Sequence, residues 1–156
     1  MSKKEMNSMQ RVLTTLSHKE PDRVPLFLLL SMHGAKELNL SIEDYFSKAE
    51  NVFEGQMRLQ KKYSNDCYYS FYHAALEVEA FGTEVIYSED GPPNSGTPII
   101  RDFEDIKRLE PPKISEAKVL HKVLKTIELL KDQAKDEIPI IAVAISPFSL
   151  PVMQLG

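Results

Sequence analysis

The chain has 156 residues, of which 42% are hydrophobic and 27% charged, and its 19 Lys and Arg against 23 Asp and Glu give a net charge of −4. These values are typical of one globular domain and argue against a collagen-like, coiled-coil or disordered chain. The mildly acidic balance provides no basic patch for nucleic acid or an anionic membrane, so we expect neither as a partner.

The sequence carries no sign of membrane insertion or export. No apolar run approaches the roughly 18 residues that a membrane-spanning helix needs, and the amino terminus has no apolar stretch of the kind found in a secretory signal. Cys67 is the only cysteine and cannot form an internal disulfide, which is compatible with a reducing compartment. We therefore expect a cytoplasmic protein.

The first third of the chain alternates helical and extended patterns. Apolar residues at helical spacing predict a short amphipathic helix over residues 2–16, which ends before Pro21. The unbroken apolar run 24–30 is typical of a strand covered on both faces, as in parallel sheets. A loop over residues 31–40 is expected next, followed by a helix that Ser41 caps and that continues to about Lys62.

The alternation continues to the end of the chain. The aromatic-rich residues 65–71 predict a second strand, and residues 73–81 a helix closed by Gly82. Two extended pieces, 84–87 and 97–100, flank a turn-rich loop and predict an inserted hairpin. A long helix over 115–135 precedes another buried strand over 138–145, after which a new loop and helix begin. This order predicts an α/β fold with a parallel sheet.

Few residues suggest chemistry by themselves. His73 and Glu77 have the i, i+4 spacing of a metal pair, but without a second cysteine or histidine a hydrogen-bonded pair on a helix surface is the better interpretation. His33 follows the first strand, where α/β proteins place their sites, and can line a pocket or be an ordinary loop histidine. The aromatic residues at the end of the second strand can wall a pocket or pack in the core.

The order of several segments resembles one superfamily, that of uroporphyrinogen decarboxylase and the corrinoid-dependent methyltransferases such as methylcobalamin:coenzyme M methyltransferase. The segments are Arg11-Val12-Leu13, Glu20-Pro21-Asp22-Arg23-Val24-Pro25, Asn65-Asp66-Cys67, Glu79-Ala80-Phe81-Gly82, Gly91-Pro92-Pro93 and Ser146-Pro147-Phe148-Ser149-Leu150. The resemblance implies the amino-terminal portion of a (β/α)8 TIM barrel. Residues 1–156 would form a single partial domain, with residues 1–20 as the helix before the barrel, the hairpin as an insertion, and a truncation after the third of eight strands.

Departures from the family pattern favour one branch. The arginine-rich segment that follows the first strand in the decarboxylases corresponds to Ser31-Met32-His33-Gly34-Ala35, and their Phe-Ser-Asp segment corresponds to Tyr69-Ser70-Phe71-Tyr72. A substrate with many carboxylates needs fixed guanidinium partners, which are absent here. The resemblance therefore implies the first part of a cobalamin-dependent methyltransferase that moves a methyl group between a corrinoid and a thiol or another acceptor.

That branch implies zinc and a corrinoid, methylcobalamin, as cofactors, but no zinc ligand can be assigned in this chain. The pocket residues that the resemblance implies at the barrel mouth are Met32, His33, Ser70, Tyr72, His73, Phe148 and Ser149, none with a catalytic role. A small-molecule substrate is expected, with a corrinoid protein as a further partner, and the uncovered barrel surface could drive self-association. Two alternatives stay open: a uroporphyrinogen decarboxylase of porphyrin and heme biosynthesis, and an inactive truncated remnant or partner-dependent module.

Overall fold

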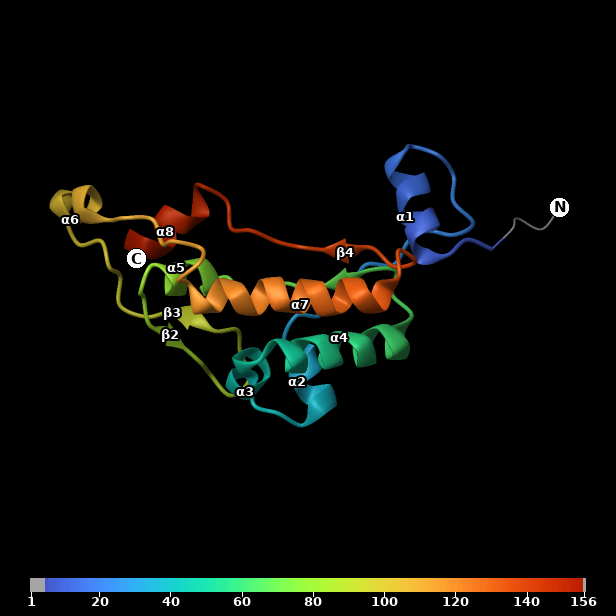
Figure 1. Cartoon of the computed structure of the whole chain (residues 1–156), viewed down its shortest axis with the longest axis horizontal. Helices are drawn as coiled ribbons and strands as arrows, with labels where there is room; N and C mark the ends of the chain where they lie inside the picture. Colours follow the sequence, from blue (N-terminus) through green and yellow to red (C-terminus); the bar gives the residue numbers. More distant parts are fainter. Residues whose placement is uncertain (1–4, 156) are drawn as a thin grey trace.

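A computed structural model of the chain describes residues 5–155. Its helices are α1 (Ser8–Leu16), α2 (His33–Leu38), α3 (Ile42–Ser47), α4 (Ala49–Tyr63), α5 (Leu76–Ala80), α6 (Phe103–Arg108), α7 (Lys118–Ala134) and α8 (Ser149–Leu155). Its strands are β1 (Tyr68–Tyr69), β2 (Val85–Ile86), β3 (Asn94–Ser95) and β4 (Ile140–Ile141). Figure 1 shows an elongated molecule in which α4 and α7 lie on one side of β4, with α1 and α8 at opposite ends.

Two small sheets organise these elements. Strand β1 pairs in parallel with β4, with Tyr68 opposite Ile140 and Tyr69 opposite Ile141. Strand β2 pairs antiparallel with β3, with Val85 opposite Ser95. The predicted α/β fold with a parallel sheet and an inserted hairpin is therefore confirmed.

The predicted strands are longer than the observed ones. Residues 24–30 form no strand ladder within the described chain, and the amide of Asp66, which donates to the Leu26 carbonyl at 2.7 Å, ties them to the segment before β1. The prediction of a strand over 24–30 was wrong, because a strand ladder needs a neighbouring strand along its whole length. The strands predicted over 65–71 and 138–145 shorten to two residues each, and residues 142–144 are exposed rather than buried.

The hairpin closes earlier than the sequence suggested. Its second strand is β3, inside the stretch predicted as a turn, and residues 97–100 form no strand. The amide of Gly96 donates to the Glu84 carbonyl at 2.7 Å, which brings the returning chain against β2 before Thr97 is reached. The second strand of the hairpin therefore lies at residues 94–95, before the predicted residues 97–100.

Three helical predictions also need correction. Residues 31–40 contain α2 rather than only a loop, because Gly34 and Ala35 are buried against neighbouring helices. The single helix expected from Ser41 breaks at Lys48. There the side-chain amide of Asn51 and the hydroxyl of Ser47 both donate to the Asp44 carbonyl, at the end of α3. Helix α6 was not predicted. The Asp102 carboxylate caps it, accepting from the amides of Glu104 and Asp105.

The other helices agree with the predictions within a few residues. Helix α1 begins at Ser8 with Asn7 as its N-cap, and residues 2–4 of the predicted helix lie outside the described chain. Gly82 follows α5 with a φ of +96°, a conformation that favours glycine. Helix α1 also contacts a distant part of the chain, because the amide of Met9 donates to the Glu137 carbonyl just before β4.

The main core lies between α2, α3, α4, α5 and α7. Its fully buried members include Tyr45, Phe46 and Val52, and a second cluster of Tyr68, Leu130 and Ala134 joins β1 to α7. Helices α2 and α4 cross closely: a Cβ added at Gly55 would lie 2.6 Å from Tyr45 Cε2 and 2.9 Å from the Cα of Gly34. Only glycine permits this crossing.

Gln56 of α4 connects the helix layer to the extended segments. Its side-chain amide donates to the Leu30 carbonyl at 3.1 Å, and its oxygen accepts from the Tyr69 amide at 3.1 Å. Gln56 is buried, so these two bonds satisfy backbone groups that would otherwise be unpaired in the interior. No helix among residues 5–155 combines the length and apolar character required to cross a bilayer.

Candidate functional site

The parallel pairing of β1 and β4 brings their carboxyl ends together. The amide of Ser70 and its hydroxyl both donate to the Ile141 carbonyl, each at 3.1 Å. Beyond these ends the chain enters the 71–75 segment on one side and the 142–148 segment on the other. Loops at this position of a parallel sheet carry the binding sites of most α/β proteins.

A small hollow lies between these two segments. It is lined by Ser70, Phe71, Tyr72, His73, Leu76, Glu77, Val123 and Val143. One carboxylate oxygen of Glu77 accepts a hydrogen bond from the Ile145 amide at 2.9 Å, so Glu77 holds the chain that follows β4 against α5. The hydrogen-bonded pair predicted for His73 and Glu77 was wrong: Glu77 binds this backbone amide, and His73 lies before α5 in the interior.

His73 is buried between aromatic rings. The ring centroids of Phe46 and Tyr87 lie 5.4 and 6.0 Å from the imidazole, and Nδ1 has no hydrogen-bond partner among residues 5–155. Burial, with a smaller contribution from the positive charge of Lys122, lowers the pKa of His73 to about 4. The imidazole is therefore neutral near pH 7 and offers its ring nitrogens without a positive charge.

Tyr72 points from the same segment toward α7. Its hydroxyl lies 2.7 Å from the Thr126 hydroxyl and also donates to the Lys122 carbonyl at 3.3 Å. Burial raises the pKa of Tyr72 to about 12, so the phenol stays protonated. The ring thus contributes to the hollow and to the main core at once.

Met32 and His33 line a different and larger hollow. It has a volume of about 150 Å³ and lies between α2 and the loop of the hairpin, where Glu89 and Asp90 contribute carboxylates and Lys36 an ammonium group. His33 is exposed at the first position of α2, while Met32 packs partly against the main core. The hairpin loop was not singled out from the sequence as part of a site, because its position beside α2 depends on tertiary packing.

Phe148 and Ser149 begin α8 at the far end of the 142–148 segment. The Ser149 amide donates to the Ser146 hydroxyl oxygen at 3.0 Å, which caps the start of the helix, and the Phe148 side chain is 79% exposed. The structure therefore brings Ser70, Tyr72 and His73 together, and places the other predicted pocket residues in two separate groups. All three groups follow an extended segment of the chain.

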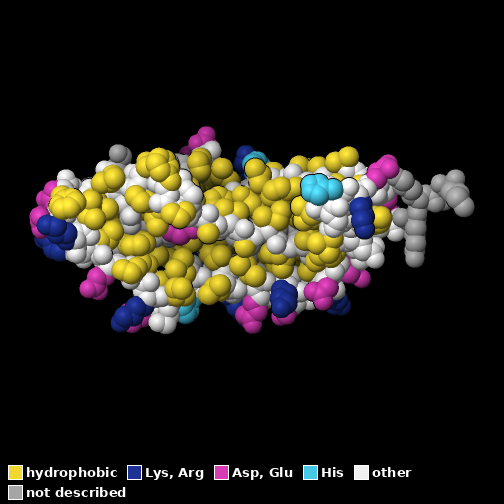
Figure 2. Space-filling model, turned by 90° about the horizontal axis from the view of Figure 1, so that it is seen from above, with side chains coloured by type: hydrophobic (Ala, Val, Ile, Leu, Met, Phe, Trp, Pro, Cys, Tyr) yellow, Lys and Arg dark blue, Asp and Glu magenta, His cyan; other side chains and the backbone are white. Residues whose placement is uncertain are grey.

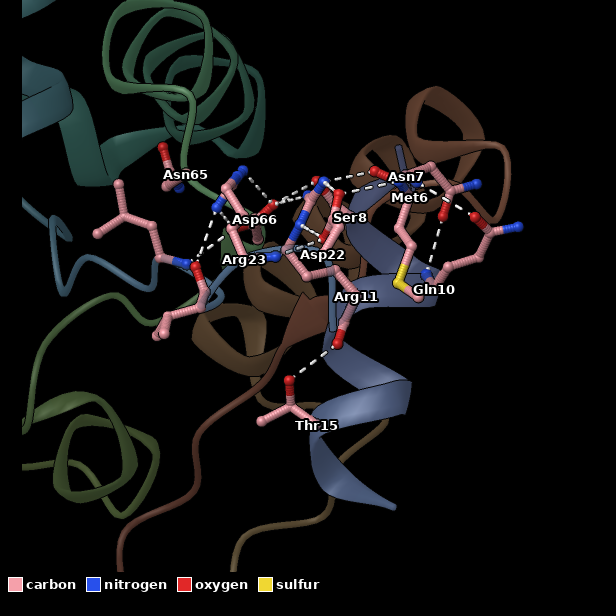
Figure 3. A network of polar contacts seen from close by, with 12 residues as sticks. Met6, Asn7, Ser8, Gln10, Arg11, Thr15, Asp22, Arg23, Asn65 and Asp66 are labelled. Carbon is pink, nitrogen blue, oxygen red and sulfur yellow. Dashed lines mark hydrogen bonds and ion pairs between the residues drawn. The ribbon is translucent and has the colours of Figure 1, made fainter. Parts of the chain in front are cut away.

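The opposite end of the strands holds a dense polar network (Figure 3). The Asp66 carboxylate accepts hydrogen bonds from the Ser8 hydroxyl, the Leu26 amide and the guanidinium groups of Arg11 and Arg23, at 2.6 to 3.0 Å. Arg11 also binds Asp22 through two nitrogens, at 2.7 and 2.8 Å. The network sits before β1, at the amino end of the sheet, where it joins α1 and residues 22–26 to the start of the strand and stabilises the fold.

Another hollow, of about 430 Å³, lies between the starts of α4 and α7. Its lining mixes lysines with Glu50 and Glu116, and it is distant in the chain from the segments that follow the strands. We therefore assign the candidate site to the carboxyl ends of β1 and β4.

No group of three His, Cys, Asp or Glu side chains suited to a metal ion occurs in residues 5–155. Cys67 is buried, and burial, assisted by the nearby negative charge of Asp66, raises the pKa of its thiol to about 11. A thiol in this state is a poor metal ligand, since metals bind the thiolate. Residues 5–155 therefore do not form a zinc site.

These contacts define a class of protein: an α/β fold with a parallel strand pair whose carboxyl ends carry the candidate site. Residues 7–156 match the family model for uroporphyrinogen decarboxylase (URO-D), and the chain belongs to this family. No match was found among curated proteins.

The fold is also that of a methyltransferase from Methanosarcina mazei, with a TM-score of 0.81 at 15% sequence identity. The match covers 97% of this chain and 46% of the methyltransferase, so the chain spans about half the length of that protein.

Proposed function

We propose that this chain forms the first half of the substrate-binding mouth of a methyl-transferring member of the uroporphyrinogen decarboxylase family. In this proposal the chain is the amino-terminal portion of a (β/α)8 barrel, cut after the third barrel strand, and residues 24–30 correspond to the first strand. The fold shared with a methyltransferase supports the barrel interpretation, since a parallel strand pair with helices packed beside it is part of what such a portion contains.

The observation that carries the proposal is the absence of guanidinium groups near the strand ends. The arginines of residues 5–155 are Arg11, Arg23, Arg58, Arg101 and Arg108, and none lines the hollows that contain Met32, His33 or Ser70. One charged side chain lines the hollow at Ser70, the carboxylate of Glu77. A substrate with many carboxylates would be repelled there, whereas an uncharged methyl donor or a thiol would not.

The neutral His73 and the apolar walls of Phe71 and Val143 suit a methyl group and its acceptor. A methyl group needs no hydrogen bonds, and apolar walls strip water from an acceptor thiolate, which makes that thiolate a stronger nucleophile once it has formed. We assign Met32, His33, Ser70, Tyr72, His73, Phe148 and Ser149 to the walls of this mouth. Methylcobalamin is the proposed methyl donor, presented by a corrinoid protein.

The test is an assay of the natural polypeptide that contains this chain. Incubation with methylcobalamin and a thiol should demethylate the corrinoid. The absorbance of the corrinoid follows this reaction, which is run with and without added zinc. Incubation with uroporphyrinogen should release no carbon dioxide. Carbon dioxide release without methyl transfer would contradict the proposal and establish the decarboxylase alternative.

One variant links the assay to the mouth. His33→Ala removes an exposed imidazole beside Met32 and should lower kcat/KM about fivefold to tenfold, the loss expected for one hydrogen bond to a bound ligand. His121→Ala is the matched control, because His121 is also exposed and lies on α7. Unchanged kinetics for His33→Ala would remove this residue from the mouth.

A further inference from the structure

The hollow between the starts of α4 and α7 is lined mostly by positive charge. It has a volume of about 430 Å³ and lies outside the candidate site. Two carboxylates line it, and so do four lysines, which are Lys48, Lys118, Lys122 and Lys125. The chain as a whole has 19 Lys and Arg against 23 Asp and Glu. The excess of lysines is therefore a local feature of this hollow.

Most of this positive charge is not neutralised by neighbouring side chains. Lys125 pairs with Glu128 at 2.8 Å, and Glu116 of the lining pairs with Lys113 at 3.2 Å. The other three lysines of the lining form no ion pair within residues 5–155, and the carboxylate that remains beside them is that of Glu50. The hollow therefore keeps an excess of positive charge.

Main-chain donors lie beside the same lysines. Ala49 and Lys118 are the first residues of α4 and α7, both line the hollow, and neither helix has a side chain that caps its first turn. Amides of a first helical turn have no partner within their own helix. The ammonium group of Lys122 donates to the Phe46 carbonyl at 3.1 Å, which holds its charge in a fixed position. The hollow thus offers several donors, both ammonium and amide, to one anion.

These donors suit phosphate better than carboxylate. Lysine binds phosphate as a point charge, whereas carboxylates are often held by the two parallel hydrogen bonds of an arginine. No arginine and no aromatic ring of residues 5–155 lines the hollow, so neither a bidentate carboxylate contact nor a stacked base is available there. Its volume is in the range of sites for whole small molecules, and a single phosphate group would leave most of it empty. We propose that this hollow binds a small compound with at least two phosphate groups, and binds it through those groups.

The hollow also lies apart from the apolar side of the molecule. Figure 2 looks onto the side of β4 and α8 and shows hydrophobic side chains along the length of the molecule, with most charged groups at the rim. In the proposed barrel, the later strands join the sheet on this side. Helices α4 and α7 lie together on one side of β4 (Figure 1), and the hollow between their starts belongs to that helix layer. Completing the sheet therefore leaves the hollow accessible to a ligand.

Isothermal titration calorimetry with pyrophosphate tests the proposal on the natural polypeptide that contains this chain. One pyrophosphate should bind per chain, and its affinity should fall as the salt concentration rises from about 50 to about 200 mM, because salt screens exposed charges. Lys48→Gln and Lys118→Gln each remove one ammonium group from the lining. Each should weaken binding about tenfold, the loss expected for one hydrogen bond from a charged donor. The readout is binding, so it is independent of whether the polypeptide transfers methyl groups.

Lys61→Gln is the matched control, because Lys61 is also exposed, lies in the last turn of α4 and carries the same charge. Thermal unfolding without ligand checks that all three variants keep the stability of the parent. No binding of pyrophosphate would overturn the proposal, as would binding that Lys48→Gln and Lys118→Gln weaken no more than Lys61→Gln does.

ADP, which carries the same diphosphate on a nucleoside, distinguishes two sources of the ligand. Tighter binding of ADP than of pyrophosphate would assign the hollow to a nucleotide. Equal or weaker binding of ADP would assign it to an inorganic phosphate compound. Both results support a phosphate site between α4 and α7.

Discussion

Asp66 is the residue on which most of the amino-terminal contacts converge. Its side chain is fully buried, and it binds groups from α1 and from the 22–26 segment. The latter include the guanidinium of Arg23, whose side chain is about half exposed. Burial by itself would raise the pKa of Asp66, but hydrogen bonds from Arg23, the Leu26 amide, Ser8 and Arg11 outweigh it and lower the pKa. The carboxylate is therefore charged near pH 7.

Replacing this carboxylate should destabilise the chain strongly. Asp66→Asn leaves the buried guanidinium of Arg11 with only Asp22 as an ionic partner, and removing one member of a buried ion pair costs about 3–5 kcal/mol. Urea unfolding followed by circular dichroism measures the loss. Asp132→Asn, an exposed change on α7, is the control and should alter the free energy of unfolding by less than about 0.5 kcal/mol.

His73 makes the stability of the fold depend on pH. Its pKa is about 4 in the folded chain and about 6.5 in an unfolded one, so the unfolded state binds more protons between these values. The contribution of the neutral His73 to the free energy of unfolding is therefore fully present above pH 6.5. It falls as the pH drops toward 4, by up to about 1.4 kcal/mol per pH unit. His73→Phe should flatten this part of the profile, measured by urea unfolding from pH 7 to pH 4. An unchanged slope would show that His73 is not buried in its neutral form.

Among the elements, α2, α3 and α4 pack around the buried ring of Tyr45, which the close approach of α2 and α4 at two glycines makes possible. The ring of Tyr45 occupies the space that side chains at Gly34 and Gly55 would need. Tyr45 is fully buried, and burial raises its pKa above the ordinary value for tyrosine. The crossing of α2 and α4 is thus fixed by two glycines and one tyrosine.

Adding one methyl group at this crossing should be costly. Gly55→Ala places Cβ against Tyr45 and the Gly34 backbone, and overpacking of this kind destabilises by about 1–3 kcal/mol even though alanine favours helix. Thermal unfolding measures the change. Gly91→Ala is the comparison, since its nearest neighbour there is the mobile end of Ser88. Equal stability of the two variants would mean that α2 can move away from α4.

How far the elements could be predicted depends on the range of the interactions that form them. The long helix α7 and the cap of α3 at Ser41 follow from local patterns, and so does Gly82 after α5. The break at Lys48 depends on Asn51 reaching back to Asp44, which apolar spacing does not reveal. Helix α6 was missed although Asp102 is a good N-cap. Strand lengths were overestimated because an apolar run does not show whether a neighbouring strand pairs with it, and residues 142–144 are exposed in spite of their apolar side chains.

The candidate site was predictable in outline only. That Ser70 and the residues after β4 share one end of the sheet follows from parallel strands. The depth of His73, the direction of the Tyr72 hydroxyl and the use of Glu77 by a backbone amide depend on how α5 and α7 pack. The hollow beside Met32 and His33 depends on the hairpin loop folding back toward α2.

For the whole molecule, the two ends of the parallel strands have different tasks. The amino end carries the network around Asp66, in which every charge has an ionic partner, and the carboxyl end carries small hollows and a neutral histidine. The stabilising network and the candidate site thus lie at opposite ends of the strands, as in parallel α/β proteins generally. Changes at Ser70 or His33 can alter a site without loosening α1.

The contact between α1 and the segment after α7 also limits how early α1 can reach its native position during translation. The amide of Met9 binds the carbonyl of Glu137, so this bond cannot form until 128 further residues have been synthesised after residue 9. At translation rates of about 5–20 residues per second this takes between about 6 and 26 s. During that interval the first helix emerges without its final neighbour, and the amino-terminal segment is the part of the nascent chain that waits longest for its native contacts.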